Sequence, residues 1–329
     1  MGELWIEFGA VFGVSFVLTT MLTRFIIPIL KGKKAGQHIL EIGPRWHASK
    51  EGTPTMGGIA FIMAILLSLT GVAVFYATKG KQKELIPLAL TMALAVMNGM
   101  IGFVDDFCKL MKKQNQGLKA YQKFVLQVLA ALVYVFLLNR LGYIDTSVHI
   151  PFTERSVELG AVYYLFSVFV IVGMVNSVNL TDGIDGLAGT VTLVVFTFFA
   201  FVGIQYMHSS LTLISAALMG GMLGFLLYNL HPAKVFMGDT GSLFLGGAVT
   251  GAAFLLNEPM IVFLVGGMYA VESVSVILQV GSFKLRNKRI FKMAPIHHHF
   301  EKCGWKEGKI VTVFGLITAA LCVLAWFGL

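Results

Sequence analysis

The sequence predicts an all-α integral membrane protein, built as a single polytopic membrane domain over residues 1–329 with about ten transmembrane helices. Of the 329 residues, 57% are hydrophobic and only 13% are charged, and the mean hydropathy is +0.80. A soluble domain carries about 25% charged residues, so this composition excludes a soluble enzyme and a disordered scaffold. Ten spans of roughly 20 apolar residues would use about 200 residues and leave the rest for loops.

Apolar segments separated by polar or Gly/Pro-rich stretches define the individual helices. The first segment has no basic region before it and no small-residue cleavage site, so we expect a retained helix and not a signal peptide. The eighth segment is short for a span. The predicted spans are about 4–30, 54–77, 85–104, 121–141, 157–177, 186–206, 211–230, 241–256, 259–281 and 308–329.

The loops between these spans differ in basic charge. Seventeen of the 25 Lys and Arg residues fall on the loops of one side, and five fall on the other side. The positive-inside rule makes the basic side cytoplasmic, and an even number of spans leaves both termini extracytoplasmic. This topology and the anionic lipid headgroups account for the net charge of +8, so we expect no nucleic-acid partner. The predicted cytoplasmic loops are about 31–53, 105–120, 178–185, 231–240 and 282–307.

Aspartate and histidine are concentrated on the same side. Five of six aspartates and six of eight histidines lie on the cytoplasmic loops or at their junctions with spans. This distribution predicts an active site on the cytoplasmic face. A transporter, which is the alternative from another class, would place acids near the middle of the bilayer and on both sides. Glu272 is the one deep acid, and we expect it to pair with a neighbouring helix.

Two adjacent carboxylates end the third span in the string G-F-V-D-D-F. Asp105 and Asp106 can bind a hard cation together, or one can hold a metal while the other handles a proton. Solvated acids that only terminate a helix are the alternative. The cost of placing acids at the edge of the hydrocarbon favours a functional role.

The string N-S-V-N-L-T-D-G-I-D-G-L-A has a polar residue at every third position, namely Asn176, Asn179, Asp182 and Asp185. In a continued helix these residues would share one face, whereas the two Asp-Gly steps predict that the helix breaks there. Either geometry gathers carboxylates and amides where glycine lets the backbone approach a ligand.

A further polar string, N-L-H-P-A-K-V-F-M-G-D-T-G-S, precedes the eighth span. Asp239 lies in its Gly-flanked turn, where an aspartate can serve simply as a helix cap. Capping does not account for Asn229 and His231 beside it. Phe236 is a candidate for stacking on a base, although a single aromatic residue near an interface is more often a membrane anchor.

The longest basic loop contains M-A-P-I-H-H-H-F, with His297, His298 and His299 in succession. Adjacent rings rarely direct all three nitrogens at one metal ion, and the chain has no H-x-x-x-H spacing here. These histidines therefore fit better as donors to phosphate oxygens. Lys50 and Thr55 in the string H-A-S-K-E-G-T-P-T-M-G-G are further candidate ligand contacts.

These polar strings together favour phosphoryl transfer. Carboxylates with Mg²⁺, and clamps of Lys, Arg and His, stabilise the charge that develops on phosphate oxygens. The chain has no Walker motif and no kinase signature, so ATP is not the expected donor. A site at the lipid interface implies that one substrate is a lipid.

In this order and membrane context, the motifs resemble the polyprenyl-phosphate N-acetylhexosamine-1-phosphate transferase superfamily. The resemblance runs from about Lys50 to Trp305. The strings that carry it are G-T-P-T-M-G-G, V-D-D, N-L-T-D-G-I-D-G-L-A, V-F-M-G-D-T-G-S, S-V-I-L-Q-V-G-S-F-K-L-R and M-A-P-I-H-H-H-F. The triple-histidine string separates the chain from relatives that use UDP-N-acetylglucosamine, and such a sibling transferase is the nearest alternative.

The resemblance implies ten transmembrane helices with a cytoplasmic active site, usually in a homodimer, in the cell membrane of a bacterium. The implied reaction transfers phospho-N-acetylmuramoyl-pentapeptide from its UDP derivative to undecaprenyl phosphate. The implied products are the first lipid-linked peptidoglycan precursor and UMP, and the implied cofactor is Mg²⁺.

The resemblance also implies roles for individual residues. Asp239 matches the metal ligand, Asp105 matches the acid proposed to deprotonate the lipid phosphate, and Asp106 and Asp182 complete the acidic centre. The expected catalytic residues further include Lys123, His298 and His299. The expected substrate-binding residues are Lys50, Thr55, Asn176, Asn179, Asp185, Asn229, Phe236, Gln279 and His297.

Overall fold

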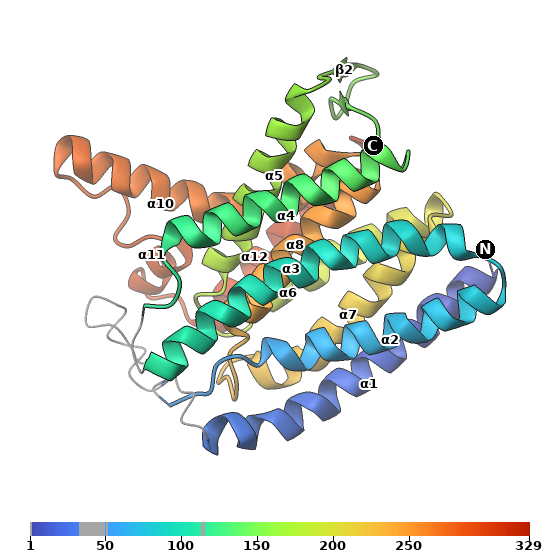
Figure 1. Cartoon of the computed structure of the whole chain (residues 1–329). Coiled ribbons are helices and arrows are strands. Elements are labelled where there is room, and N and C mark those ends of the chain that lie inside the picture. The colour runs from blue at the N-terminus through green and yellow to red at the C-terminus, as the bar shows by residue number, and fades with distance from the viewer. Residues whose placement is uncertain (1, 33–49, 51, 113–115) are drawn as a thin grey trace.

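The computed structural model describes residues 2–32, 50, 52–112 and 116–329, and it is a bundle of long helices (Figure 1). The predicted loop 31–53 therefore lies largely outside the described residues. The long helices are α1 (Gly2–Gly32), α2 (Gly58–Thr78), α3 (Gln82–Lys112), α4 (Ala120–Arg140), α5 (Val162–Thr181), α6 (Leu187–Gln205), α7 (Ser209–Asn229), α8 (Gly238–Leu255), α10 (Gly267–Arg286) and α12 (Glu307–Trp326). The short elements are β1 (Ser147–His149), β2 (Ser156–Glu158), η2 (Pro259–Ile261), α9 (Val262–Val265) and α11 (Ile296–Lys302).

The all-α membrane class is confirmed. Within the described part of the chain, eight helices are long and apolar enough to cross a membrane, or nine if a bent pair counts as one span. The remaining predicted span, 241–256, corresponds to α8, which falls outside this set. Helix α8 has only 18 residues and is rich in glycine, but residues 240–255 are all buried. A helix enclosed by other helices needs no lipid-facing apolar surface, so hydropathy underestimates it.

The predicted span 259–281 is not one straight helix. The segment Pro259–Val265 and helix α10 meet at an angle of 79°, with Gly266 at the break. The backbone at Gly266 packs closely, because a Cβ there would lie 2.6 Å from the carbonyl oxygen of Val262. Apolar composition alone did not distinguish a bent segment from a straight one. After the bend, α10 points away from the bundle (Figure 1).

Helix α3 is longer than predicted. It continues past the expected end at residue 104 as far as Lys112, so Asp105 and Asp106 are helical and do not lie in a loop over 105–120. The drop in hydropathy at the two aspartates marks where the helix leaves the apolar part of the membrane. The helical hydrogen bonds of the backbone continue beyond that point. Similarly, α10 extends to Arg286 and α11 forms inside the predicted loop 282–307.

Helix α8 lies at the centre of the bundle and packs against α3, α5 and α2. Glycines let these helices approach closely. A Cβ at Gly58 of α2 would lie 2.5 Å from the Cα of Gly241 on α8, so neither position accommodates a larger side chain without movement. This close packing carries polar residues of different motifs to the same end of the bundle.

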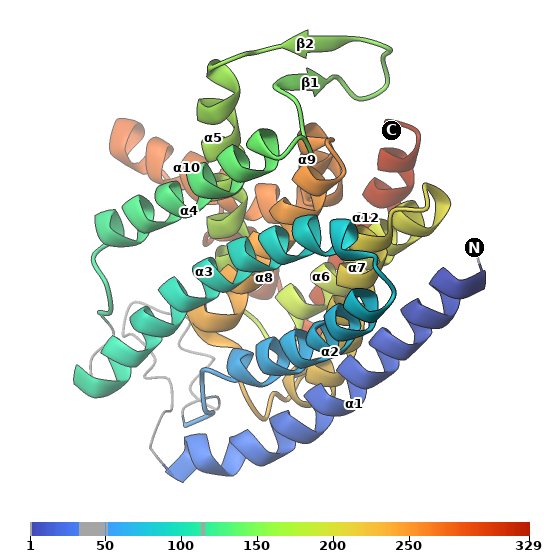
Figure 2. The same cartoon turned by 45° about the vertical axis from the view of Figure 1, so that its right-hand side comes forward.

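The other end of the bundle carries both chain termini and a small hairpin, as Figures 1 and 2 show. Strands β1 and β2 pair antiparallel, with Val148 opposite Val157. Between the predicted spans 121–141 and 157–177 no secondary structure was predicted, so the hairpin is new. Three-residue strands are too short to produce a clear alternating pattern.

Candidate active site

Three aspartates from two helices meet at the end of the bundle away from the termini. Asp105 and Asp106 lie on α3, and Asp239 lies in the first turn of α8. One carboxylate oxygen from each residue lies within 4.8 Å of the other two. Asp105 and Asp106 are buried. The packing of α3 on α8 therefore joins the two motifs into one acidic centre.

Two lysines lie among these carboxylates. Lys109 Nζ is 2.6 Å from Asp105 Oδ2 and 3.1 Å from Asp239 Oδ2. Lys123 Nζ, from α4, is 3.0 Å from Asp105 Oδ2 and 2.8 Å from Asp239 Oδ2. Because three carboxylates face two ammonium groups, the ionised cluster keeps a net negative charge that favours a cation.

Hydrogen bonds fix the direction of the carboxylates. Asp106 Oδ2 accepts from the backbone N–H of Thr240 at 2.9 Å and from its hydroxyl at 2.8 Å. The amide of Asn179 on α5 donates to Asp239 Oδ1 at 3.0 Å. The acids are therefore held from α5 as well as from α3 and α8.

Glycine is needed twice around this centre. A Cβ at Gly102 of α3 would lie 2.0 Å from the carbonyl oxygen of Asp239. A Cβ at Gly117 would lie 2.4 Å from Asp105 Oδ1, and the next N–H, that of Leu118, donates to the same oxygen at 2.7 Å. The close approach of the backbone in both places requires a residue without a side chain.

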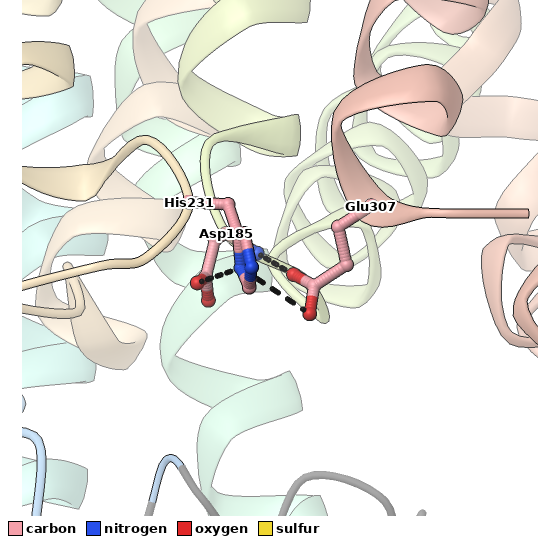
Figure 3. Close-up of side chains that lie close together, drawn as sticks. All are labelled: Asp185, His231 and Glu307. Atoms are coloured by element: carbon pink, nitrogen blue, oxygen red, sulfur yellow. Dashed lines mark hydrogen bonds and ion pairs between the residues drawn. The ribbon is translucent and has the colours of Figure 1, made fainter.

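A second charged cluster lies between the α5–α6 loop, the α7–α8 loop and the start of α12. Lys50 Nζ is 2.7 Å from Asp185 Oδ1 and 2.7 Å from Glu307 Oε2. His231 Nδ1 is 3.0 Å from Asp185 Oδ2 and 3.7 Å from Glu307 Oε1. Figure 3 shows Asp185, His231 and Glu307 pointing toward one another. Their spacing would suit a metal, but this set has only two carboxylates, facing Lys50 and an imidazole, where the acidic centre has three, so we interpret it as a charge network.

A hollow of about 560 Å³ opens beside this network. It is lined by His231 and by residues of the segment 301–309, which runs from the end of α11 into the first turn of α12. Glu307 belongs to both the hollow and the network.

Asp182 lies within electrostatic range of both clusters. It follows the last residue of α5, so the helix breaks at the first Asp-Gly step as the sequence predicted. Desolvation raises the pKa of Asp182 well above its ordinary value, and the charges of Asp239 and Asp106 raise it further. Asp182 is therefore neutral at higher pH than an ordinary aspartate and can donate a hydrogen bond.

The loop before α8 is held by Asn229. Its Oδ1 accepts from the N–H of Gly186 at 3.1 Å, and its Nδ2 donates to the carbonyl of Val235 at 2.9 Å. Thr55 lies beside this loop, because the N–H of Phe236 donates to the carbonyl just before Thr55 at 2.8 Å. Three of the predicted substrate contacts thus share one region, next to Asp239.

Two predicted contacts make their observed hydrogen bonds elsewhere among the described residues. Asn176 donates to Gln127 of α4 at 2.8 Å. Gln279 holds the loop after α10, because its Oε1 accepts from the N–H groups of Ile290 and Phe291 and its Nε2 donates to the carbonyl of Phe291. Both side chains therefore position backbone or helices around the site.

The three adjacent histidines have three different surroundings on α11. His297 is fully buried, and His298 is nearly so. His298 Nδ1 is 2.6 Å from Glu301 Oε2, and His299 Nδ1 accepts from the N–H of Lys292 at 3.1 Å. The described rings of His298 and His299 therefore face different partners.

The structure adds residues that the motifs did not single out. Lys109 follows the aspartate pair by three and four residues, so helical periodicity places it on the same face, and the sequence contained this signal. Glu307 had no such signal. An acid in the first turn of a helix is common because it complements the helix dipole, and only the fold places Glu307 beside Lys50.

Comparison with known protein families agrees with this site. Residues 88–257 match the pattern of glycosyl transferase family 4, and this range contains all six aspartates of the chain. Residues 50–62 match the phospho-N-acetylmuramoyl-pentapeptide-transferase signature 1, which begins at Lys50.

Curated relatives resemble the chain over nearly its whole length. A phospho-N-acetylmuramoyl-pentapeptide-transferase of Alkaliphilus metalliredigens is 46% identical over 327 residues and covers 96% of both chains. That of Staphylococcus carnosus is 43% identical over 320 residues, or 96% of this chain and 97% of the relative. That of Clostridium botulinum strain Eklund 17B is 46% identical over 318 residues, or 96% of this chain and 94% of the relative.

The helical bundle and its acidic centre define a membrane-embedded glycosyl transferase of family 4. Within that class, the chain belongs to the phospho-N-acetylmuramoyl-pentapeptide-transferase family. The bacterial relatives and the apolar helices make it a multi-pass protein of the bacterial cell membrane.

Proposed function

We propose that this chain transfers phospho-N-acetylmuramoyl-pentapeptide from its UDP derivative to undecaprenyl phosphate, giving the first lipid-linked peptidoglycan precursor and UMP. The observation that carries the proposal is the meeting of Asp105, Asp106 and Asp239 with two lysines at one end of a membrane bundle. Relatives of nearly the same length are named for this transfer. They do not favour a sibling reaction with UDP-N-acetylglucosamine or a transporter.

In the proposed reaction, an oxygen of the lipid phosphate attacks the sugar-linked phosphorus of the donor in line. The new P–O bond forms as the bond from that phosphorus to the UMP oxygen breaks, and UMP leaves. Asp105 takes the proton of the lipid phosphate, while Lys109 and Lys123 stabilise charge on the phosphate oxygens. A covalent sugar-phosphate adduct formed without lipid acceptor would contradict this direct route and support initial attack by Asp105.

We propose Mg²⁺ as the cofactor, held by Asp239 with Asp105 and Asp106 beside it. The residues fit this ion, because their carboxylate oxygens lie within 4.8 Å of one another and a hard cation prefers oxygen ligands. When bound, Mg²⁺ neutralises charge on the donor diphosphate. Asn179 keeps Asp239 directed toward the centre through its hydrogen bond.

We propose that the nucleoside end of the donor binds beside the second charged cluster. Lys50 and Asp185 would contact it, with Asn229 and Phe236 on the adjoining loop. His298 on α11 would donate to the sugar phosphate.

We further propose that the acidic end of the bundle faces the cytoplasm and that the chain crosses the membrane ten times. Both termini lie at the opposite end of the bundle, which an even number of crossings requires (Figures 1 and 2). Among the described residues, Lys109 and Lys123 lie at the acidic end, in keeping with the positive-inside rule. We also propose that the chain forms a homodimer, as the family resemblance implies.

Purified protein incubated with polyprenyl phosphate and Mg²⁺ tests the reaction. We expect UMP release with UDP-N-acetylmuramoyl-pentapeptide and none with UDP-N-acetylglucosamine. A chelator should reduce the rate at least about tenfold, and added Mg²⁺ should restore it, because the diphosphate charge is otherwise unneutralised. Absence of UMP with both donors would refute the proposed function, and a chelator-resistant rate would refute the metal alone.

Replacing Glu307 with glutamine should weaken donor binding. Lys50 would lose one of its two carboxylate partners, so its position toward the donor would be less well defined. We expect KM for the UDP donor to rise about tenfold and kcat to change by less than about twofold. This is the result of losing an interaction that is equally strong in the ground state and the transition state. Glu154→Gln in the exposed hairpin is the matched control. An unchanged KM would separate Glu307 from donor binding.

A further inference from the structure

Glu272 is a buried acid in α10, at the junction with the triple-histidine helix. Its side chain and that of His297 are both 0% exposed. Glu272 Oε1 lies 3.1 Å from His297 Nδ1, and Oε2 lies 3.4 Å from the backbone nitrogen of the same residue. A carboxylate in such a place is costly unless it is paired, so this double contact to one residue requires an explanation.

We infer that Glu272 is a positioning residue, which holds the His297 ring in one orientation with the proton on Nδ1. The oriented ring in turn fixes α11 against the α5–α6 loop, residues 182–186. This inference deepens the proposed function and rests on it, because the loop and the histidines belong to the proposed transfer site. Glu272 itself touches neither the acidic centre nor the charge network in the contacts described above.

The two oxygens of an ionised carboxylate can only accept hydrogen bonds. The backbone N–H of His297 donates toward one oxygen, and the ring nitrogen Nδ1 lies 3.1 Å from the other. A carboxylate oxygen repels the lone pair of a bare ring nitrogen, so a nitrogen 3.1 Å from Glu272 is expected to carry the ring proton. A buried acid selects the tautomer and orientation of a histidine in this way in other enzymes.

The opposite ring nitrogen faces the site. A Cβ at Gly183 would lie 2.2 Å from His297 Nε2, so this nitrogen packs directly on the backbone between Asp182 and Asp185. The rings of His297 and His298 are also in contact, with centroids 4.1 Å apart. A change in the His297 ring would therefore move both the loop and the next histidine.

This arrangement connects three motifs that are distant in sequence. Glu272 belongs to the span after the bend, His297 belongs to α11, and Gly183 belongs to the first Asp-Gly step. An apolar residue at 272 would fill the same space but would not select a tautomer. The position of the acid is thus better explained by orientation than by stability, since buried ion pairs contribute little net stability.

The first test is Glu272→Gln, which keeps the shape but presents one donor and one acceptor. We expect kcat to fall about 10- to 100-fold, as for other supporting residues around a site, with KM for the donor within about twofold. Tyr269→Phe is the matched control, because Tyr269 is buried three residues earlier on α10 and bonds to Thr192. If both variants show the same kcat per folded protein, Glu272 has no positioning role.

The second test reads the tautomer directly by ¹⁵N NMR of histidine-labelled wild-type protein, with His297→Asn to assign the signal. A protonated Nδ1 in the wild type is expected, and this proton should be lost from Nδ1 in Glu272→Gln. A bare Nδ1 in the wild type would overturn the inference even if Glu272→Gln does not fold. Wild-type protein that releases no UMP would instead indicate failure of the proposed function.

Discussion

Replacing Asp239 with asparagine is expected to lower transfer by about 10³-fold, because a central charge in the site would be removed while its shape is kept. Among the acids that the structure describes, only Asp239 contacts Lys109 from α3, Lys123 from α4 and Asn179 from α5. An amide in its place would bind a hard cation poorly and would leave the two lysines facing fewer negative charges. The rate of UMP release per folded protein measures the effect.

The matched control for this change is Asp145→Asn. Asp145 precedes the hairpin at the opposite end of the bundle, where its carboxylate accepts hydrogen bonds from Ser147. We expect this variant to retain the wild-type rate. Near-normal activity and Mg²⁺ dependence in Asp239→Asn would show that the metal assignment is wrong.

Replacing Gly102 with alanine should lower transfer by about 100-fold without altering any ionisable group, since a displacement of about 1 Å in a site has this cost. The new Cβ would lie 2.0 Å from the carbonyl oxygen of Asp239 and 2.7 Å from the backbone nitrogen of Thr240. Backbone atoms cannot rotate away as a flexible side chain can. Helices α3 and α8 must therefore separate, which moves Asp239 away from Asp105 and Asp106.

A second effect of Gly102→Ala is a loss of stability of about 1–3 kcal/mol from overpacking, which a lower melting temperature in detergent would report. Gly71→Ala on α2 is the control, because a Cβ there meets nothing within 4 Å. This control should retain both activity and stability. If Gly102→Ala were as active as Gly71→Ala, close packing of α3 on α8 would not set the geometry of the acids.

Much of the architecture was predictable because a bilayer imposes a simple rule on composition. Most spans coincide with helices in the structure, and Lys109 could have been added to the acidic group from its helical spacing to Asp105 and Asp106. The errors arose where hydropathy was used to infer backbone geometry. The hydropathy pattern predicted that the third span ends before the aspartates, whereas α3 continues to Lys112, and it gave no sign of the bend at Gly266.

The sequence by itself determined the class of protein, the spans and the groups of polar residues at their ends, because these depend on local composition and on short spacings. Only the tertiary structure decided which groups meet. The pairing of Lys50 with Glu307, and of Glu272 with His297, joins residues that share no motif. Those contacts depend on how helices pack, and close packing in turn depends on backbone approach at glycines such as Gly102 and Gly183. No property of an isolated segment contains that information.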